Sequence, residues 1–222
     1  MALIVSMVSQ KGGVGKSTLA RLLGCVFAAL GWSVKIADLD IGQGTSFQWR
    51  SRRLEHQIEP DVPVEQFGNV DKALALAEQY DMLILDGAPH ATSSTRAIAD
   101  KSNLTVIPTG LSLDDLVPAV VLAHDLVKHG VPRERITFVL SRVGDSELEI
   151  EEARAYIEKA GYEVLPGALP EKTGYRRASD TGRALTETRF ESLNHHAEQV
   201  AQGMVDRISQ LTSTSNKKRS IA

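Results

Sequence analysis

Short apolar runs and helix-periodic segments alternate along most of the 222-residue chain. A run of about four to eight apolar residues between turn residues is typical of a strand in a parallel sheet, whereas apolar residues three and four positions apart indicate one face of a helix. The alternation predicts an α/β fold with a mainly parallel twisted sheet and helices on both faces. The predicted strands are residues 3–8, 33–37, 82–85, 104–107 and 136–140, and the predicted helices are residues 16–30, 70–80, 113–128, 147–159 and 193–211.

A single domain accounts for almost the whole chain. With 42% hydrophobic residues, a chain of this length can bury one substantial core. Residues 1–211 contain every periodic segment, while residues 50–68 are too mixed in composition to assign. Residues 212–222 are polar and include a basic cluster, so we expect them to form a disordered basic tail.

A glycine-rich segment follows the first predicted strand directly and predicts a phosphate-binding loop. Successive glycines let backbone N–H groups turn toward one anion, and the helix that begins near Lys16 adds the positive end of its dipole. Lys16 can then reach the β- and γ-phosphates of a nucleotide, and the Ser17 hydroxyl can bind Mg²⁺. A second lysine stands at the front of the loop, although such a loop ordinarily needs one. The predicted nucleotide-binding segment is Lys11, Gly12, Gly13, Val14, Gly15, Lys16, Ser17 and Thr18.

Aspartates stand at the ends of two other predicted strands. Asp86 follows the apolar run 82–85, which is the usual position of a carboxylate that holds Mg²⁺ through water beside such a loop. Asp38 and Asp40 follow the second predicted strand, and we expect Asp40 to orient the water that attacks the γ-phosphate. Ligands of parallel sheets bind at the carboxyl ends of the strands, so the loop and these carboxylates should converge there. The predicted Mg²⁺ ligands are Ser17, Asp40 and Asp86.

Composition and charge exclude several classes of protein. The formal net charge of −3 argues against a uniformly basic nucleic-acid binder, although a local basic patch remains compatible with it. The single cysteine, Cys25, has no intramolecular disulfide partner, as expected in the reducing cytoplasm. No segment reaches the roughly 20 apolar residues that cross a bilayer, and residues 1–8 begin a strand rather than a signal peptide. We therefore expect a cytoplasmic protein without a membrane contact.

The motifs resemble those of the ParA/MinD family of deviant Walker ATPases, most closely the small plasmid-type ParA partition proteins. The resemblance covers nearly the whole chain and implies a P-loop NTPase fold. One difference concerns the segment after Asp40, where relatives usually read Asp-x-Asp-Pro-Gln, but here Ile41 and Gly42 separate Asp40 from Gln43. The resemblance rests on residues 11–18, on Asp38-x-Asp40 with Gln43 downstream, and on residues 85–89, 107–109 and 140–142.

The resemblance implies a dimeric ATPase that uses ATP and Mg²⁺. In such a homodimer Lys11 crosses to the phosphates held by the other subunit, Lys16 and Asp40 share catalysis with it, and Pro108 contacts the nucleotide. Dimers of this kind can extend into higher polymers. The ATP-bound dimer binds DNA without sequence preference, which places the protein on the nucleoid, and a ParB-like or ribbon–helix–helix partner stimulates hydrolysis and releases it. The candidate DNA contacts are Arg176, Arg177, Arg183, Lys217, Lys218 and Arg219.

Related protein classes can be compared with the same sequence. Iron–sulfur carriers need cysteine pairs, and the chain has one cysteine. The membrane-binding helix of MinD-type regulators has no counterpart in residues 212–222, which have almost no apolar face. A metabolic ATP-dependent ligase of the dethiobiotin synthetase type is the alternative from a different class, but it needs a carboxylate- or amine-binding pocket that no motif indicates. The sequence therefore favours a positioning ATPase that segregates a plasmid or another cargo.

Overall fold

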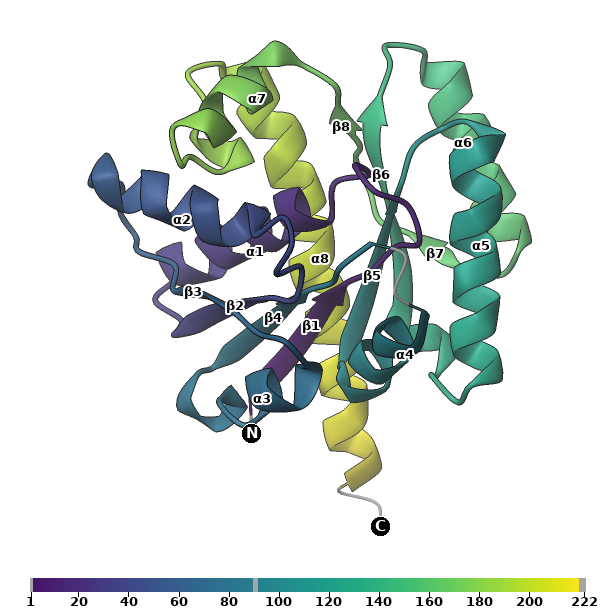
Figure 1. Cartoon of the computed structure of the whole chain (residues 1–222). Coiled ribbons are helices and arrows are strands. Elements are labelled where there is room, and N and C mark those ends of the chain that lie inside the picture. The colour runs from purple at the N-terminus through teal and green to yellow at the C-terminus, as the bar shows by residue number, and fades with distance from the viewer. Residues whose placement is uncertain (1, 90–91, 220–222) are drawn as a thin grey trace.

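A parallel sheet forms the centre of the molecule (Figure 1). The computed structural model describes residues 2–89 and 92–219, with side chains for residues 2–89 and 93–213. The eight-stranded sheet has the order β3-β2-β4-β1-β5-β6-β7, and β8 pairs with β6. Every described strand pair is parallel, as the apolar runs predicted. The strands are β1 (Leu3–Met7), β2 (Val34–Asp38), β3 (Val64–Gln66), β4 (Met82–Asp86), β5 (Leu104–Thr109), β6 (Ile136–Val143), β7 (Glu163–Val164) and β8 (Leu169–Pro170).

Helices cover both faces of this sheet and enclose an apolar core on each side (Figure 1). On one face, Trp49, Tyr175 and Met204 bring α2, α7 and α8 into the same core as α1. On the other face, the second core is built from α3, α4, α5 and α6. The helices are α1 (Lys16–Ala29), α2 (Thr45–Glu55), α3 (Val70–Leu74), α4 (Thr92–Lys101), α5 (Leu113–Lys128), α6 (Glu147–Lys159), α7 (Thr173–Asp180) and α8 (Glu191–Arg219), with short 3₁₀ turns at η1 (Ala77–Gln79), η2 (Arg133–Arg135) and η3 (Leu185–Glu187).

The last helix extends beyond its predicted end at residue 211. The backbone of α8 is helical as far as Arg219, so residues 212–219 continue the helix where a disordered tail was expected. Extending a helix that packing has already nucleated adds one hydrogen bond per residue, which favours this continuation. The side chains of Lys217, Lys218 and Arg219 lie outside the described part of the structure, as do residues 220–222 entirely.

Candidate functional site

The register of the central strands brings the predicted motifs together. Met7 of β1 and Asp38 of β2 both pair with Asp86 of β4, so three neighbouring strands end at one level. The chain leaves β1 at this edge and enters α1 at Lys16 through the glycine-rich loop. Gly15 has φ +104°, and a Cβ there would lie 2.6 Å from the Ser141 Oγ. Both the backbone conformation and the space therefore require glycine at the start of α1.

The N-terminus of α1 is open toward an anion. Among the residues that the structure describes, no side chain caps its first turn, and the first turn contains no acidic residue. Lys16 is 7% exposed, and its Nζ donates to the Lys11 carbonyl at 3.1 Å. Burial lowers the pKa of Lys16, while Asp86 and Asp40 act in the opposite direction. A phosphate group here would accept from both the backbone N–H groups and the ammonium group.

Asp86 has one oxygen engaged and one oxygen free. The side chain is 1% exposed, its Oδ2 accepts from the Ser46 hydroxyl at 2.7 Å, and its Oδ1 is buried without a hydrogen-bond partner among the described residues. Burial raises the pKa of Asp86 to about 6, the Asp38 charge adds to this rise, and the hydroxyls of Ser46 and Ser17 oppose it. An unpartnered carboxylate oxygen beside a serine hydroxyl fits Mg²⁺, which binds hard oxygen ligands.

A metal ion at this site would take few of its ligands from protein side chains. Within the described residues, no group of three or more His, Cys, Asp or Glu side chains is placed to hold a metal. Mg²⁺ in phosphate-binding sites uses one or two carboxylates and completes its octahedron with phosphate oxygens and water. Ser17 and Asp86 would hold the ion, and Asp40 lines the same cleft as Lys16 and Ser17.

Asp38 at the end of β2 and Asp40 just beyond it have different surroundings. Asp38 is 1% exposed, and its Oδ2 accepts from the N–H groups of Ser46 (3.0 Å) and Phe47 (3.1 Å) at the start of α2. Burial raises the pKa of Asp38, although these backbone donors lower it. Asp40 is partly exposed, lines the cleft beside the loop and accepts from the Gln43 N–H at 3.2 Å. Asp40, rather than Asp38, therefore has its carboxylate available to a water molecule in the cleft.

The cleft beside the loop has a volume of about 630 Å³ and includes most of the predicted site. Pro108 does not line it, because it is buried within β5, where it pairs with Val139 of β6. The structure does not bring Pro108 into this cleft, and its contact with the nucleotide stays a prediction. The lining includes Gly12, Gly13, Gly15, Lys16, Ser17, Thr18, Arg21, Asp40, Gln43, Arg142, Pro170, Tyr175 and Arg176.

Lys11 faces a neighbouring cleft of about 640 Å³ instead. Its Nζ lies 2.8 Å from the Asp115 Oδ1 on α5, and the two side chains are 38% and 28% exposed. Burial by itself would raise the pKa of Asp115, but hydrogen bonds from Lys11 and Ser112 hold it below its usual value. The second lysine is therefore separate from the phosphate site of its own chain and is held at the surface by an ion pair.

Sequence reasoning missed two arginines of the site. Arg142 has φ +58°, its Nη1 donates to the Gly13 carbonyl at 2.9 Å, and its Nη2 donates to the Glu171 carboxylate at 3.1 and 3.2 Å. Arg21 is 6% exposed and lines the cleft from α1. The available signal for Arg21 was its position beside Leu22 and Leu23 on a helix of mostly apolar residues. A charged residue in such a setting requires a polar partner.

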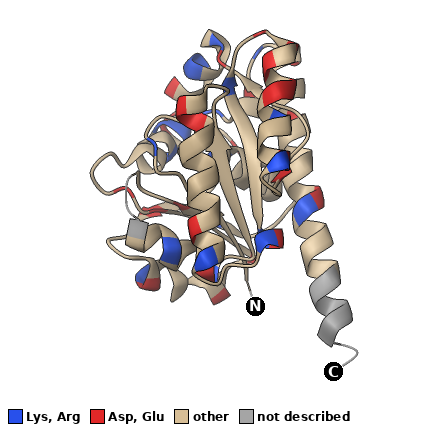
Figure 2. Cartoon of the chain, turned by 90° about the vertical axis from the view of Figure 1, so that its right-hand side faces the viewer, with Lys and Arg blue, Asp and Glu red and all other residues tan. Residues whose placement is uncertain are grey.

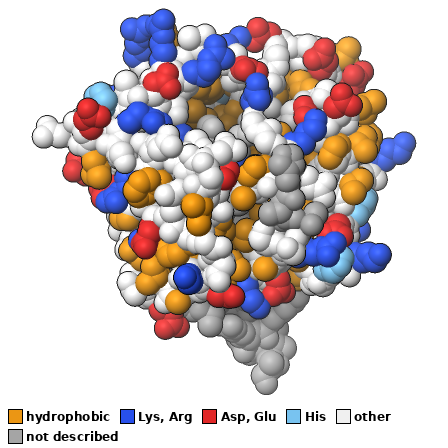
Figure 3. All heavy atoms as spheres, in the orientation of Figure 1, with side chains coloured by type: hydrophobic (Ala, Val, Ile, Leu, Met, Phe, Trp, Pro, Cys, Tyr) orange, Lys and Arg blue, Asp and Glu red, His pale blue; other side chains and the backbone are white. Residues whose placement is uncertain are grey.

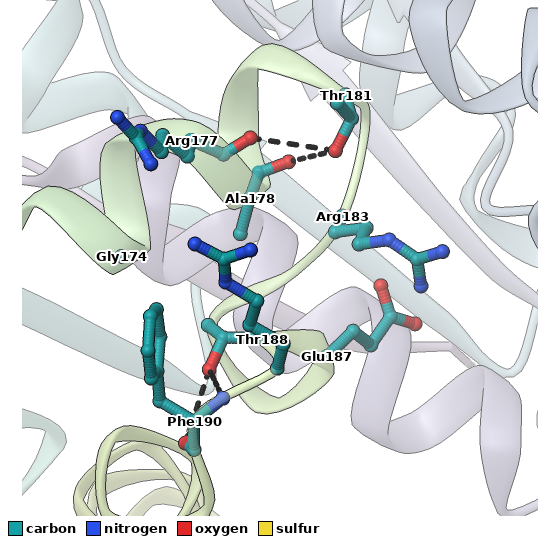
Figure 4. Close-up of a pocket in the computed structure, with 9 residues that line it drawn as sticks. Gly174, Arg177, Ala178, Thr181, Arg183, Glu187, Thr188 and Phe190 are labelled. Carbon is teal, nitrogen blue, oxygen red and sulfur yellow. Dashed lines mark hydrogen bonds between the residues drawn. The ribbon is translucent and has the colours of Figure 1, made fainter.

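The predicted DNA contacts that the structure describes gather around α7. Arg176 and Arg177 are exposed on α7 and Arg183 is exposed just beyond it, and Figure 3 shows basic side chains over this end of the molecule. Figure 4 shows Arg177 and Arg183 pointing away from one another at the edge of a hollow of about 460 Å³ that Phe190 also lines. The face formed by α5 and α6 instead mixes both signs of charge (Figure 2). Within the described residues, neither Arg177 nor Arg183 forms an ion pair.

Together, the parallel sheet, the open phosphate loop and the free oxygen of Asp86 define a P-loop nucleotide-binding domain. Residues 5–185 match the family model described as the CobQ/CobB/MinD/ParA nucleotide binding domain, and the chain belongs to this family. The resemblance to ParA/MinD proteins predicted from the motifs is confirmed.

Similar proteins include curated and structurally solved members of this group. Maintenance of carboxysome distribution protein A from Gloeobacter kilaueensis is 24% identical over 188 residues, which cover 84% of this chain and 85% of that protein. The septum site-determining protein MinD from Pyrococcus horikoshii OT3, solved with Mg-ADP, has a TM-score of 0.75 at 18% identity and covers 94% of this chain and 98% of its own. The pNOB8 ParA bound to nonspecific DNA has a TM-score of 0.60 at 14% identity, with 93% and 99% coverage. At identities this low, the similarity to the solved structures shows a shared fold and nothing more.

No helix within residues 2–89 and 92–219 combines the length and the apolar character that a bilayer span needs.

Proposed function

We propose that this protein is a cytoplasmic, nucleoid-associated ATPase that positions a plasmid or another cargo through an ATP-bound dimer on DNA. The observation that carries the proposal is the second lysine of the loop. Lys11 has its charge at the surface, 38% exposed, although the phosphate site of its own chain lies a few residues away. An ammonium group in that position is available to the phosphates of a second subunit.

Each residue of the cleft has a chemical task in the proposed hydrolysis. Lys16 and the open N-terminus of α1 bind the β- and γ-phosphates and offset the charge that develops as the terminal phosphoryl group is transferred. Asp40 orients a water molecule in line with the γ-phosphate. Ser17 and the free oxygen of Asp86 hold Mg²⁺, which when bound neutralises charge on the phosphate oxygens.

Dimerisation would exchange one partner of Lys11 for another. A partly exposed ion pair such as Lys11–Asp115 contributes about 0–1 kcal/mol, because water and salt screen it. Phosphate oxygens in a closed interface attract an ammonium group more strongly, because the local dielectric is lower and the phosphates carry more charge. ATP with Mg²⁺ would therefore favour the dimer, whereas two facing lysine-bearing loops without nucleotide would repel each other.

DNA binding is assigned to the basic surface around α7. The guanidinium groups of Arg177 and Arg183, which form no ion pair among the described residues, can contact phosphates of any sequence, which gives non-specific and salt-dependent binding, whereas Arg176 lies 3.6 Å from Glu171. The ParA structure with nonspecific DNA supports this assignment by analogy of fold. A ParB-like or ribbon–helix–helix partner would then stimulate hydrolysis and release the DNA. The metabolic ligase considered from the sequence is not favoured, since the similar proteins reported above are MinD, ParA and a carboxysome distribution protein.

The test measures oligomeric state and DNA binding together. With ATP and Mg²⁺ we expect light scattering to show dimers and the protein to bind duplex DNA without sequence preference. With ADP we expect neither dimers nor DNA binding. Lys11→Ala and Lys16→Ala should abolish both, whereas Lys159→Ala, which removes an exposed lysine on α6, should change neither. DNA binding that persists unchanged without nucleotide would count against the proposal, as would ATP-dependent dimers in the Lys11→Ala variant.

A further inference from the structure

Arg21 is a buried cation without an acidic partner. It is 6% exposed on α1, and it forms no ion pair with any residue that the structure describes. Burial lowers the pKa of Arg21 to about 10, and the charges of Asp86 and Asp38 partly oppose this effect. Keeping an unpaired guanidinium inside a protein costs free energy unless its N–H groups are well used. Its contacts therefore indicate what it does.

The first contact of Arg21 determines how Asp86 is oriented. The Arg21 Nε lies 3.3 Å from the Ser46 Oγ, which lies 2.7 Å from the Asp86 Oδ2. A guanidinium group can only donate, so the Ser46 oxygen accepts from Arg21 and its single proton is directed at Asp86. This chain of hydrogen bonds engages Oδ2 and leaves the buried Oδ1 without a partner. Arg21 thus fixes which carboxylate oxygen is free for a cation.

The second contact of Arg21 reaches α7. Its Nη1 donates to the Ser179 Oγ at 3.0 Å, in a residue 158 positions further along the chain. The same end of α7 is packed on α2, because Arg52 Nε donates to the Ser179 carbonyl at 3.4 Å and Gly182 contacts the backbone of Arg53 too closely for any Cβ. One planar side chain therefore links the oxygen environment of Asp86 with the helix that carries the exposed arginines.

We propose that Arg21 is a positioning residue that transmits the occupancy of the Mg²⁺ site to α7. The inference rests on the proposed function, in which Mg²⁺ and nucleotide bind beside Asp86. Any change in the direction of the Asp86 oxygens alters the bond to Ser46, and the fixed fork of the guanidinium carries that change to Ser179. Nucleotide state would reach the DNA-binding surface by this route, without requiring contact between DNA and the nucleotide.

Trp49 provides a spectroscopic reporter at the joint between α2 and α7. The guanidinium groups of Arg21 and Arg53 lie 5.8 and 5.3 Å from its ring centroid, and its indole N–H donates to the Arg183 carbonyl at 3.1 Å. The chain has two tryptophans, and Trp32 is 41% exposed, so Trp32→Phe leaves Trp49 as the sole reporter. Hydrogen exchange of residues 173–183 gives a second readout that does not depend on turnover.

The experiment titrates Mg²⁺ into the ATP-saturated protein in the Trp32→Phe background. In the parent protein we expect Mg²⁺ to shift Trp49 emission and to change exchange in residues 173–183. Ser46→Ala should raise the Mg²⁺ concentration for half-maximal response about tenfold, the scale typical of residues that orient a metal ligand. Ser179→Ala should leave that concentration within about twofold of the parent value but abolish the exchange change in α7, because it cuts only the second contact.

Two further variants complete the experiment. Arg21→Lys should both raise the Mg²⁺ concentration for half-maximal response and abolish the exchange change in α7, since an ammonium group cannot hold two serines in a planar fork. Thr181→Ala is the matched control, because among the described residues its hydroxyl bonds only to carbonyls of α7, and it should behave as the parent. Retention of the α7 response in both Ser179→Ala and Arg21→Lys would overturn the coupling. Normal Mg²⁺–ATP binding with no response in α7 of the parent would also overturn it but spare the proposed function, whereas absence of nucleotide binding would refute both.

Discussion

The buried carboxyl group of Asp86 gives the metal-free protein an unusual dependence of stability on pH. Its pKa is raised from 3.8 to about 6, so between these values the folded protein holds a proton that the unfolded chain has released. This rise in the pKa of Asp86 corresponds to about 3 kcal/mol of stability, because each tenfold change in proton affinity is worth about 1.36 kcal/mol. The contribution of Asp86 to the free energy of unfolding is therefore highest below about pH 4 and falls by about 3 kcal/mol as the pH rises past 6. An ion-paired aspartate shows the opposite trend, because its contribution to stability rises with pH.

Asp86→Asn removes this titration and keeps the size of the side chain. The amide oxygen can still accept from Ser46, and any cost of burying the amide NH₂ group is the same at every pH. We therefore expect the variant to gain about 2 kcal/mol relative to wild type between pH 4.5 and pH 7.5, which is the part of the effect inside that window.

Urea denaturation of both proteins in chelator, without nucleotide, measures this difference at each pH. The same substitution at the exposed Asp71 on α3 serves as the control for replacing an aspartate. A difference that stays constant with pH would refute the reasoning, and one that falls with pH would mean that Asp86 is stabilised as a carboxylate in the metal-free fold. Adding ATP and Mg²⁺ at pH 7.5 should stabilise wild type more than the variant, because in wild type the metal also satisfies the free oxygen.

Asp115→Asn should free Lys11 at a cost in stability of at most about 1 kcal/mol, since the ion pair is partly exposed. It should lower the ATP concentration for half-maximal dimerisation, measured by light scattering, and a higher ATP concentration would mean that Asp115 supports the interface. Glu187→Gln should lower the free energy of unfolding in urea by about 3 kcal/mol, because it leaves the fully buried guanidinium of Arg53 without its counter-charge, and an unchanged midpoint would contradict this. Gly182→Ala, at φ +78° against the backbone of Arg53, should lower the free energy of unfolding in urea by about 1–3 kcal/mol. It should also speed hydrogen exchange in α7, and exchange at the wild-type rate would show that the packing of α7 on α2 does not depend on this contact.

Five strands (β1, β2, β4, β5 and β6) and the longer helices could be predicted because their patterns are local and continuous, whereas the short β3, β7 and β8 were missed. Strands buried on both faces give unbroken apolar runs, and α5 and α6 begin and end at the predicted residues. The helix α6 also has a serine cap, in which the Ser146 hydroxyl accepts from the Glu149 N–H.

The helix α2 was missed because its buried face is not aliphatic. Its buried residues are Ser46, Trp49 and Arg53, which follow helical spacing but include two polar types. Each is buried through a contact with a distant segment, such as the bond from Arg53 to Glu187, which no local pattern contains. A search for apolar periodicity cannot recognise a helix of this kind.

The residues of the candidate site also differ in whether a local sequence motif contains them. The phosphate loop, Asp86 and Asp40 lie in short motifs, so the sequence was sufficient to propose them. The Arg21–Ser46–Ser179 contacts join three segments whose proximity depends on the finished sheet and on the packing of α7 over α2. Residues of this class become visible only when the fold is known.

The open N-terminus of α1 links the lifetime of the protein in the cell to bound nucleotide. A helix whose first turn lacks any capping group is incomplete, and a bound phosphate would supply the missing acceptors. Ligand that binds only the folded chain adds RT ln(1 + [L]/Kd) to stability, or about 2.7 kcal/mol at a hundredfold excess over Kd. The abundance of the protein would then follow the supply of nucleotide. Nucleotide-free molecules would unfold more often and be exposed to proteases, whereas nucleotide-bound molecules would persist.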